Sequence, residues 1–504
     1  MTRTLAVIGA GPAGLAAAVT AAEQGMTVTV IDAGLQSGGQ FWRHPSEPHL
    51  PHFARDESVG HHHWRRFVDL RTRLDAAVAR GAVRRLYGRQ VWQILAGGTG
   101  FVLHTAAVAG ADPVPPAERA VSAERVILAT GAYDRQLPVP GWTLPGVMAA
   151  GGVQALVKAH QIAPGRRAVV AGTGPFLLSV AAGLAEAGVE VVAVCEANSL
   201  LRWARRPLHA ALEPGKLLEG AEYARTFLRH RIPFRSRTIV TRVHGEDRAE
   251  GVSLSRVDTR GRATGEPTRV DADLVAFGWG FTPQLELAVQ LGLRTRLDVD
   301  GSLVVDIDAD HRASLSGVYV AGEATGIGGA VQSWTEGELA ARTTVADALG
   351  TDAPARRRGL RRRVARARAF ARAMHAASVV PTEWSRWLEP DTLVCRCEEV
   401  DAAAIAEAVD DQRAEDPRDV RVTARPGMGW CQGRVCGFAL ASLVGERTGC
   451  RWSTAQIEPL HKRSIGIPLP LGEIAALAGA STPPEPESPH AHALAPATAA
   501  PDRP

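Results

Sequence analysis

The chain has 504 residues, of which 45% are hydrophobic and 22% charged, a composition typical of a globular protein with room for about three domains. Its 57 basic and 53 acidic residues leave a net charge of only +4, which argues against nucleic acid as a partner. Six cysteines in a chain of this length do not make a disulfide scaffold.

The first predicted elements form a nucleotide-binding unit that starts almost at residue 1. An apolar strand at 5–8, a glycine-rich turn, a helix at 15–24 and a strand at 27–31 follow one another. The turn divides the apolar N-terminal stretch, so we expect neither a signal peptide nor a membrane span there. We expect the protein to be cytoplasmic, with any membrane association made through partners.

The glycines of this turn have separate physical tasks. The first permits the tight turn, the second lets backbone N–H groups approach a pyrophosphate, and the third lets the helix pack close to the strand. The helix N-terminus adds about half a positive charge at the same place. An acid at the end of the second strand can accept both ribose hydroxyls. The predicted site residues are Gly9, Gly11, Pro12, Ala13, Gly14 and Asp32.

Further along the chain, other segments favour FAD at this first site. The turn at Gly39 and Gln40 follows the ribose-binding strand and is expected to approach the flavin. A buried strand at 126–129 leads into Thr130 and Gly131, which we place beside the adenosine. A late strand leads into Gly322 and Glu323, and we expect Glu323 to contact the ribityl chain, where Asp is more usual.

A second β-turn-α-β pattern begins about 160 residues after the first, since Gly9 and Gly172 open the two loops. Its glycines are Gly172 and Gly174, and its second strand ends at Glu196. Leu177 stands at the third glycine position and is expected to push the helix away from the strand. Glu196 favours NAD(H) over its 2′-phosphorylated form. Another adenine nucleotide and an empty structural relic remain alternatives.

These elements predict an α/β protein with two dinucleotide-binding domains of the glutathione-reductase type. A small, mainly helical C-terminal domain contains four cysteines, Cys395, Cys397, Cys431 and Cys436, and is predicted to be a [2Fe–2S] domain. The first part of the FAD domain is expected at 1–150 and its second part at 276–350, around a nucleotide domain at 151–275. A basic linker helix at 351–390, a cluster domain at 391–470 and a disordered tail at 471–504 follow.

The cysteines exclude one activity and suggest another. No cysteine occurs before Cys195, so the chain lacks the thiol pair that disulfide reductases place beside their flavin. The tail instead carries four thiols in two tight pairs, Cys395 with Cys397 and Cys431 with Cys436. Four thiolates can hold a [2Fe–2S] cluster or zinc. The C-x-C spacing is unusual for zinc, so a cluster is the preferred interpretation, with an unligated thiol group as a further alternative.

Two other features allow more than one interpretation. The arginine-rich stretch at 355–377 is interpreted as the solvated face of a linker helix, or as a docking face for an acidic partner. Histidines at 44, 49, 52 and 61–63 lie in a loop without matched ligand spacing. We expect a polar loop over the flavin or a partner contact there, rather than a metal site.

Five segments carry a resemblance to a known family: GGQFWR, LATGAYDRQLPVPGWTLPGV, GVYVAGEATGIGGA, VCRCEEV and RPGMGWCQGRVC. They resemble the FAD-containing α-type subunits of heteromeric amine and amino-acid dehydrogenases. This family includes the corresponding chains of opine oxidase, hydrogen cyanide synthase, and hydroxyproline and proline dehydrogenases, and the central part of sarcosine oxidase α. The likeness runs from about residue 4 to about residue 470.

The resemblance implies a division of labour. A flavin-containing β subunit would oxidise the C–N bond of the substrate, and this chain would relay the electrons through FAD and a [2Fe–2S] cluster to a carrier. A small ferredoxin-like subunit would complete the complex. Two other hypotheses are an independent NAD(P)H:acceptor oxidoreductase and a non-catalytic electron-transfer or assembly scaffold. No residue is assigned as a catalytic acid or base.

Overall fold

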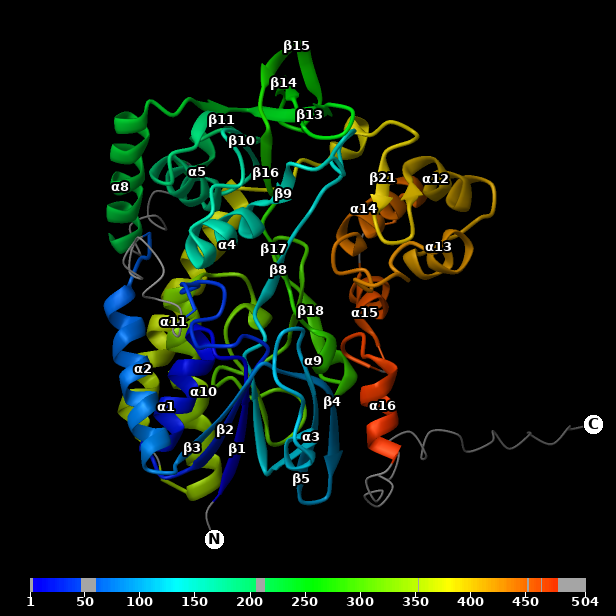
Figure 1. The fold of residues 1–504 in the computed structure, drawn as a ribbon. Coiled ribbons are helices and arrows are strands. Elements are labelled where there is room, and N and C mark those ends of the chain that lie inside the picture. The colour runs from blue at the N-terminus through cyan, green and yellow to red at the C-terminus, as the bar shows by residue number, and fades with distance from the viewer. Residues whose placement is uncertain are drawn as a thin grey trace, which may run out of the picture.

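The computed structural model describes residues 3–46, 60–204, 214–351, 353–450, 453–463 and 465–478. Figure 1 shows two α/β units stacked one above the other, with a smaller helical unit along one flank. We call these the N-terminal unit, the inserted unit and the thiol unit. No helix in the described ranges is both long enough and apolar enough to cross a membrane.

The N-terminal unit is built on a parallel sheet with the strand order β20-β7-β1-β2-β3. Side chains of β1 alternate between two cores: Leu5 and Val7 face helices, whereas Ala6 and Ile8 face a second, antiparallel layer. Burial on both faces explains the nearly continuous apolar strands. The strands are β1 (Thr4–Ile8), β2 (Thr27–Asp32), β3 (Val83–Tyr87), β7 (Arg125–Leu128) and β20 (Val318–Val320).

Two layers cover this sheet. One is helical and consists of α1 (Pro12–Glu23), α2 (Trp64–Ala79) and α10 (Ala330–Leu349). The other is the antiparallel set β4 (Arg89–Gly97), β5 (Gly100–Ala107) and β6 (Ala120–Ala123), with the short α3 (Pro116–Arg119) beside it. Helix α1 begins at Pro12, earlier than predicted, because proline is well accommodated in the first turn of a helix.

The inserted unit repeats this plan. Its parallel sheet has the order β12-β11-β10-β16-β9, and an antiparallel set β13-β14-β15 covers one face. Helices α4 (Ala150–His160), α5 (Phe176–Glu186) and α8 (Pro214–His230) lie on the other side of the sheet (Figure 1). The strands are β9 (Val147–Ala149), β10 (Arg167–Gly172), β11 (Glu190–Glu196), β12 (Phe234–Ser236), β13 (Thr238–His244), β14 (Gly251–Val257), β15 (Ala263–Asp271) and β16 (Leu274–Gly278).

Strand pairing shifts the expected domain limits by a few residues. Strand β9 pairs with β16, so residues 147–149 belong to the inserted sheet although the sequence assigned them to the first domain. The expected limit at 275/276 falls inside β16, which pairs along its whole length with β10. The chain crosses between the units through β8 (Ala132–Asp134) and β17 (Phe281–Pro283), which pair with each other.

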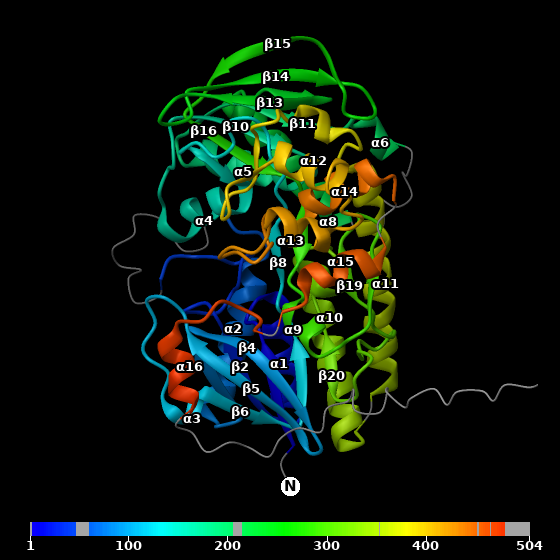
Figure 2. The ribbon, with the colours of Figure 1, turned by 90° about the vertical axis from the view of Figure 1, so that its right-hand side faces the viewer.

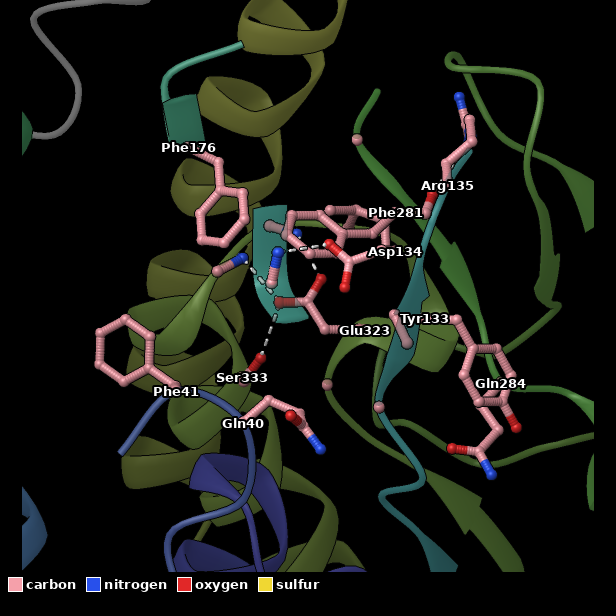
Figure 3. A pocket seen from close by; sticks show the side chains of 18 of the residues that line it. Gln40, Phe41, Tyr133, Asp134, Arg135, Phe176, Phe281, Gln284, Glu323 and Ser333 are labelled. Carbon is pink, nitrogen blue, oxygen red and sulfur yellow. Dashed lines mark hydrogen bonds between the residues drawn. The ribbon is translucent and has the colours of Figure 1, made fainter. Parts of the chain in front are cut away.

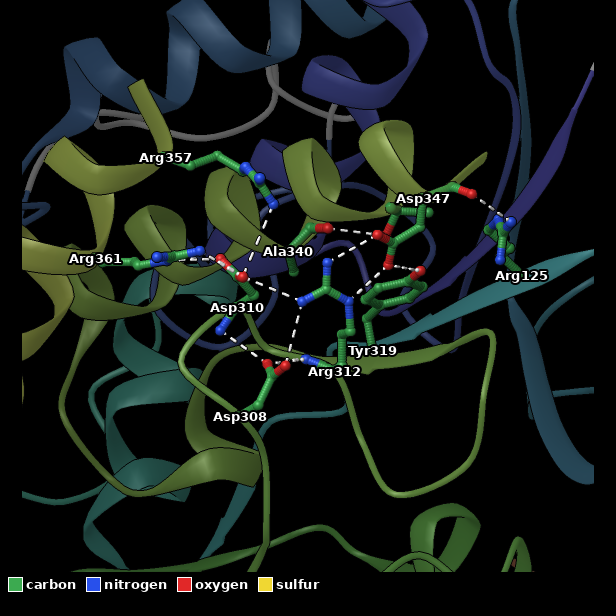
Figure 4. A network of polar contacts seen from close by, with 10 residues as sticks. Arg125, Asp308, Asp310, Arg312, Tyr319, Ala340, Asp347, Arg357 and Arg361 are labelled. Atoms are coloured by element: carbon green, nitrogen blue, oxygen red, sulfur yellow. Dashed lines mark hydrogen bonds and ion pairs between the residues drawn. The ribbon is translucent and has the colours of Figure 1, made fainter. Parts of the chain in front are cut away.

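The arginine-rich helix α11 (Pro354–Ala377) has the solvated face that the sequence predicts, but its other face is buried against the N-terminal unit. It lies along α10, and four of its arginines pair with acids of the N-terminal unit: Arg356 pairs with Glu338, Arg357 and Arg361 with Asp310, and Arg368 with Glu336. Figure 4 shows Arg361 and Arg357 reaching a wider network of Asp308, Asp310, Arg312, Tyr319 and Asp347. The opposite face, with Arg358, Arg362, Arg363, Arg366 and Arg372, is exposed.

The thiol unit combines a short hairpin with four helices. Its elements are β21 (Leu393–Cys395), β22 (Val400–Asp401), α12 (Ala402–Asp410), α13 (Pro417–Ala424), α14 (Gly437–Thr448) and α15 (Thr454–His461). Figure 2 shows these helices alongside the junction of the two α/β units. The indole of Trp142 donates to the carbonyl of Leu393 at 2.7 Å and so ties the hairpin to the body of the protein. Helix α16 (Leu471–Ala478) follows.

Candidate functional site: two glycine loops and four thiols around one cavity

The first glycine loop is held by contacts that leave no room for side chains. A Cβ on Gly14 would lie 1.7 Å from the carbonyl oxygen of Gly9, so α1 packs directly on the turn. Gly9 has φ +105°, and a Cβ there would lie 2.2 Å from the oxygen of Ala129. Both positions therefore need glycine, one for the backbone conformation of the turn and the other for the close approach of the helix.

The acid predicted to bind ribose lies directly beside this loop. Asp32 ends β2, and its carboxylate accepts hydrogen bonds from the backbone N–H groups of Ala10 and Gly34. Burial raises the pKa of Asp32, and these two backbone hydrogen bonds act in the opposite direction. An anionic acceptor at the cavity wall can bind hydroxyl donors, as a ribose site requires.

Replacement of Asp32 by asparagine is expected to weaken FAD binding by roughly tenfold to a hundredfold, because hydrogen bonds to a charged group contribute about 1.5–3 kcal/mol each. Titration of the deflavinated protein with FAD, followed by quenching of flavin fluorescence, measures this. Asp69→Asn on the exposed surface of α2 is the matched control. Equal dissociation constants for Asp32→Asn and wild type would contradict the assignment.

The Gly38–Gln40 turn lies against the glycine loop. The backbone N–H of Gly38 donates to the carbonyl of Ala10 at 2.9 Å. A Cβ on Gly39 would come within 2.7 Å of the Cα of Gly11. The turn is fixed from below by Trp42, which is fully buried and stacks on Trp334 of α10 with ring centroids 5.8 Å apart. Gln40 lines the cavity beside it.

Thr130 and Gly131 lie where the chain leaves the first sheet for the inserted unit. The Thr130 hydroxyl donates to the carbonyl of Gln284 at 2.7 Å, and the Gln284 N–H donates to the carbonyl of Gly131 at 3.0 Å. These bonds clamp the two chain crossings together at the cavity wall. Both residues line the cavity, at the end of a strand next to β1.

Glu323 points into the cavity but is engaged by its own loop. Its carboxylate accepts N–H bonds of 2.9 Å from Gly328 and from Gly329, and Figure 3 shows it beside Ser333. Burial raises the pKa of Glu323 to about 7, against the effect of these bonds. Gly322, with φ +81°, lies against Ala13 of the first loop. The two glycine segments, more than 300 residues apart in the chain, therefore meet.

All these residues surround one continuous cavity of about 2170 Å³, large enough for more than one nucleotide. Its middle is aromatic: Phe176 and Phe281 lie 5.1 Å apart between ring centroids, and Figure 3 shows Phe41 and Tyr133 on opposite sides of it. The predicted residues that line it are Gly9, Gly11, Pro12, Ala13, Asp32, Gly39, Gln40, Thr130, Gly131, Gly174, Gly322 and Glu323. Gly14 lies behind them, under the turn.

The second glycine loop opens into the same cavity. A Cβ on Gly172 would lie 1.9 Å from the oxygen of Gly278, which reproduces the tight turn of the first loop. Glu196 accepts bonds from the Gly174 N–H at 2.7 Å and from the Thr173 hydroxyl and Asn198 N–H at 2.8 Å. Burial raises the pKa of Glu196, and these bonds oppose that shift.

Leu177, at the third glycine position, is accommodated by a glycine on the neighbouring strand. The leucine is 1% exposed. A Cβ on Gly278 of β16 would lie 2.9 Å from its Cδ2, so the missing side chain of Gly278 provides the space. In the first loop, a glycine on the helix allows the close packing of helix and strand. In the second loop, the glycine that makes room is on the neighbouring strand.

The end of α11 crosses the second loop, a contact that the sequence did not predict. Ser378 lies beside Gly174, its Cβ 3.7 Å from where a glycine Cβ would stand. The Asn198 side chain donates to the carbonyl of Val379 at 2.8 Å. Ser378 and Val379 both line the cavity. The cavity is therefore bounded on this side by the segment that leads into the thiol unit.

The four predicted ligand thiols come from two loops that pack on one another. A Cβ on Gly429 would stand 2.4 Å from the Cβ of Cys397, so the loops meet closely. Cys395 and Cys436 are buried, Cys431 is half-buried and Cys397 is exposed. Within the described ranges, no set of three or more His, Cys, Asp or Glu side chains is arranged to hold a metal ion.

Two of the thiols are shifted toward the thiolate. The Cys436 thiol, as a hydrogen-bond donor, lowers the pKa of Cys395 to about 6 and that of Cys431 to about 5. The backbone N–H of Gly427 donates to the Cys395 sulfur at 3.3 Å. The pKa of Cys436 is raised by its contacts with these two thiols, and burial raises that of Cys397. Thiolates with backbone N–H donors are the form in which cysteine binds metals and clusters.

An arginine between Cys431 and Cys436 joins the loop that carries these two cysteines to the cavity wall. Arg434 donates from Nε to the Tyr133 hydroxyl at 2.9 Å and pairs with the Glu286 carboxylate at 2.8 Å. Its Nη1 donates to the carbonyl of Cys431 at 3.3 Å. Nearby, the Arg396 guanidinium lies over the Trp142 ring. Neither Tyr133 nor Glu286 was singled out from the sequence.

Two of the predicted loop histidines, His62 and His63, contact the inserted unit. The His62 ring bonds to the Tyr223 hydroxyl of α8 at 2.8 Å, and His63 lies 3.4 Å from Glu219 on the same helix. Burial lowers the pKa of His61 to about 3, so this ring is neutral at physiological pH. His44 is buried, and the positions of His49 and His52 lie outside the described residues.

Comparisons with known proteins agree with this geometry. Residues 3–341 match the family described as pyridine nucleotide-disulphide oxidoreductase. Hydrogen cyanide synthase subunit HcnB of Pseudomonas aeruginosa is 31% identical over 88% of this chain and 93% of its own length. An opine oxidase subunit of Rhizobium meliloti is 32% identical over 94% of this chain and 87% of its own length.

A solved structure has a similar fold over most of the chain. The L-proline dehydrogenase from P. horikoshii covers 94% of this chain and 79% of its own, with 21% identity and a TM-score of 0.63. That coverage exceeds the region matched by the family. The chain therefore belongs to the pyridine nucleotide-disulphide oxidoreductase family, as an FAD-dependent oxidoreductase related to the HcnB chain of hydrogen cyanide synthase and to opine oxidase.

Proposed function

We propose that this chain is the FAD- and [2Fe–2S]-bearing subunit of a heteromeric dehydrogenase or oxidase that acts on C–N bonds of amines, opines, imino acids or glycine. Its task is to relay electrons from a substrate-oxidising partner to a carrier. The observation that carries the proposal is the contact of Arg434, between Cys431 and Cys436, with Tyr133 in the wall of the large cavity.

The residues around the cavity fit FAD. The first glycine loop offers a turn without side chains and the N-terminus of α1 for a pyrophosphate, and Asp32 offers an acceptor for ribose. Gly39, Gln40 and Glu323 border the aromatic middle, where an isoalloxazine ring would lie. Thr130 and Gly131 hold together the two chain crossings in the cavity wall, and Gly322 lies against the first glycine loop. FAD, when bound, supplies two-electron chemistry, and a [2Fe–2S] cluster supplies one-electron chemistry.

The thiol loops fit an iron–sulfur cluster. Cys395, Cys397, Cys431 and Cys436 would be its ligands, and two of them are already shifted toward the thiolate by their neighbours. Gly427 and Gly429 bring backbone close to the sulfur positions without side chains in between. Backbone N–H donors to sulfur offset the negative charge of a cluster and tune its potential.

The relatives are named as subunits of larger enzymes, which supports the proposal that this chain also has partner subunits. The partners assigned to this chain are a flavin-containing β subunit, a small ferredoxin-like subunit, and an electron carrier. The assembly would work in the cytoplasm, with any association to membranes made through these partners. Co-expression with candidate partner chains, followed by size-exclusion chromatography, tests this part of the proposal.

Anaerobic purification followed by assays for FAD, iron and acid-labile sulfide tests the cofactors. Cys431→Ser is expected to lose iron and sulfide and to keep FAD, because the cluster loses a thiolate ligand while the flavin cavity is unchanged. Cys450→Ser is the matched control, since Cys450 is a thiol outside the two pairs and should leave the iron content at the wild-type value. Zinc in place of iron, or colourless wild-type protein, would refute the proposal.

A second candidate is a self-sufficient NAD(P)H:acceptor oxidoreductase. One observation favours it: the loop with Gly172 and Gly174 opens into the same cavity as the first loop, so a second nucleotide could face the flavin. Glu196 would then exchange bonds within its own loop for ribose hydroxyls. Stopped-flow mixing with NADH separates the two functions, because bleaching of the flavin by NADH alone supports the reductase.

A further inference from the structure

Two aromatic side chains belong to two cavities at once. Tyr133 and Phe438 line the large cavity, and they also line a smaller space of about 40 Å³ between the N-terminal unit and the thiol unit. Tyr133 comes from β8, where the chain first leaves the parallel sheet of the N-terminal unit. Phe438 comes from the first turn of α14, two residues after Cys436. Each side chain could therefore be part of the shortest path, through covalent and hydrogen bonds, from the large cavity to the four cysteines.

The contacts of Tyr133 lead directly to a predicted ligand. Its hydroxyl accepts from Arg434 Nε at 2.9 Å, and Arg434 Nη1 donates to the carbonyl of Cys431 at 3.3 Å. The remaining nitrogen, Nη2, donates to the carbonyl of Gly466 at 2.5 Å, so every nitrogen of the guanidinium is held. Glu286, 6% exposed, balances its charge. This rigid, charge-assisted arrangement fixes the distance between the ring and the thiol loop.

The contacts of Phe438 lead elsewhere. Its ring lies under the Arg135 guanidinium, 4.1 Å from ring centroid to Cζ. Arg135 in turn pairs with Asp300 and donates to the Ser302 hydroxyl at 2.5 Å. These partners belong to the N-terminal unit, and none of these bonds reaches a cysteine. The Phe438 contact therefore joins the units by packing, whereas the Tyr133 contact joins the cavity wall to the thiol loop by hydrogen bonds.

We infer that Tyr133 and Arg434 form the link along which electrons pass singly between the flavin cavity and the four-thiol site. The inference rests on the proposed function and deepens it by assigning the route. One electron leaves the donor in the cavity and one arrives at the thiol site for each transfer, and no bond of Tyr133 or Arg434 is formed or broken. Burial raises the pKa of Tyr133, so the phenol keeps its proton throughout.

Flash photoreduction of the bound flavin, with EDTA as the electron source, tests the link in the anaerobic holoprotein. Reduction of the cluster is followed by its absorbance and by freeze-quenched electron paramagnetic resonance. Tyr133→Phe keeps the ring and removes the hydroxyl that Arg434 contacts. We expect it to lose the fast phase of cluster reduction while its FAD content, iron content and resonance spectrum stay at wild-type values. Phe438→Leu is the matched control and should keep the fast phase.

Arg434→Met gives a readout that does not depend on transfer rates. Removal of a positive charge beside the thiols should lower the midpoint potential of the cluster, because the cation stabilises the reduced, more negative form. Tyr133→Phe should leave that potential unchanged. A potential that Arg434→Met does not move would show that the guanidinium is not coupled to the cluster and would overturn the inference.

The failures of the inference and of the proposed function are distinguishable. A wild-type protein with iron, sulfide and FAD, whose fast phase survives in Tyr133→Phe, overturns the assigned route and leaves the proposed function standing. Loss of the fast phase in Phe438→Leu with a normal phase in Tyr133→Phe assigns the route to the packing contact instead. Wild-type protein without iron and sulfide overturns the proposed function and, with it, the route.

Discussion

Replacement of Gly337 by alanine is expected to abolish FAD retention and to destabilise the N-terminal unit. Gly337 lies in α10 where this helix crosses the start of α1, and a Cβ there would stand 2.0 Å from the carbonyl oxygen of Ala13. The atom in the way is backbone, so the helices must separate. Such overpacking typically costs about 1–3 kcal/mol. It also moves Ala13, which borders the first glycine loop.

The measurement is the FAD content of the purified variant together with its thermal unfolding midpoint. Gly359→Ala in α11 is the matched control, because a Cβ there meets nothing within 4 Å. Removal of a mid-helix glycine without a clash should stabilise the protein by roughly 0.5–1 kcal/mol. Full FAD occupancy and unchanged stability in Gly337→Ala would show that the crossing of α1 and α10 is more tolerant than its geometry indicates.

Arg368→Met should produce the other large effect, because it leaves a buried carboxylate without its cation. Glu336 is fully buried and receives 2.9 Å bonds from the Gly322 N–H and Gln332, besides its 3.0 Å pair with Arg368. Removal of one partner of a buried ion pair typically costs about 3–5 kcal/mol. Since Gly322 belongs to the late glycine segment of the cavity, we also expect the variant to lose FAD on dialysis.

Urea unfolding of the apoprotein measures the loss of stability, and Arg372→Met is the control. Arg372 lies one turn further along α11 on its exposed face, so its loss should change stability by less than about 0.5 kcal/mol. Adding Glu336→Gln to Arg368→Met should recover part of the loss, because the uncompensated charge is then absent. Equal losses of unfolding free energy in Arg368→Met and Arg372→Met would contradict the prediction, because the buried arginine would then contribute no more than an exposed one.

The α/β units could be predicted because their signals are local. Apolar strands, glycine turns and a terminal acid follow one another within about 30 residues, and hydrogen bonding within that stretch determines the unit. Gly9, Gly14 and Asp32 accordingly lie close together at the end of the first sheet. The predicted limits of the inserted unit were less accurate. Strand β9 joins its sheet by pairing with β16, which is distant in the sequence, and no local pattern indicates this pairing.

The rest of the site could not be predicted because its contacts join distant residues. Tyr133 and Arg434 are 301 positions apart, and Asn198 meets Val379 across 181. Gly337 looks in the sequence like a weak point of an ordinary helix, yet its lack of a side chain allows α10 to approach α1. One signal was available: a charged residue between two cysteines, as Arg434 is, needs an acidic or polar partner when it is buried.

The arginines of α11 are another case in which contacts with distant residues could not be predicted from the sequence. A run of like charges usually marks a solvated or docking surface. In this helix the charges divide by face: Arg356, Arg357, Arg361 and Arg368 pair with acids on neighbouring elements, and Arg358, Arg362, Arg363, Arg366 and Arg372 are exposed. The acids lie earlier in the chain, so the sequence of the helix alone did not indicate which arginines would be paired.

The order in which the ribosome delivers this chain constrains how the protein matures. Helix α1 ends at residue 23, but its covering helix α10 ends only at residue 349. At a translation rate of about 5–20 residues per second, α10 is completed roughly 15–65 s after α1. The inserted sheet, by contrast, is delivered whole between residues 147 and 278 and can form during that interval. The order of synthesis therefore allows the inserted unit to fold while the helical layer of the first unit is still incomplete.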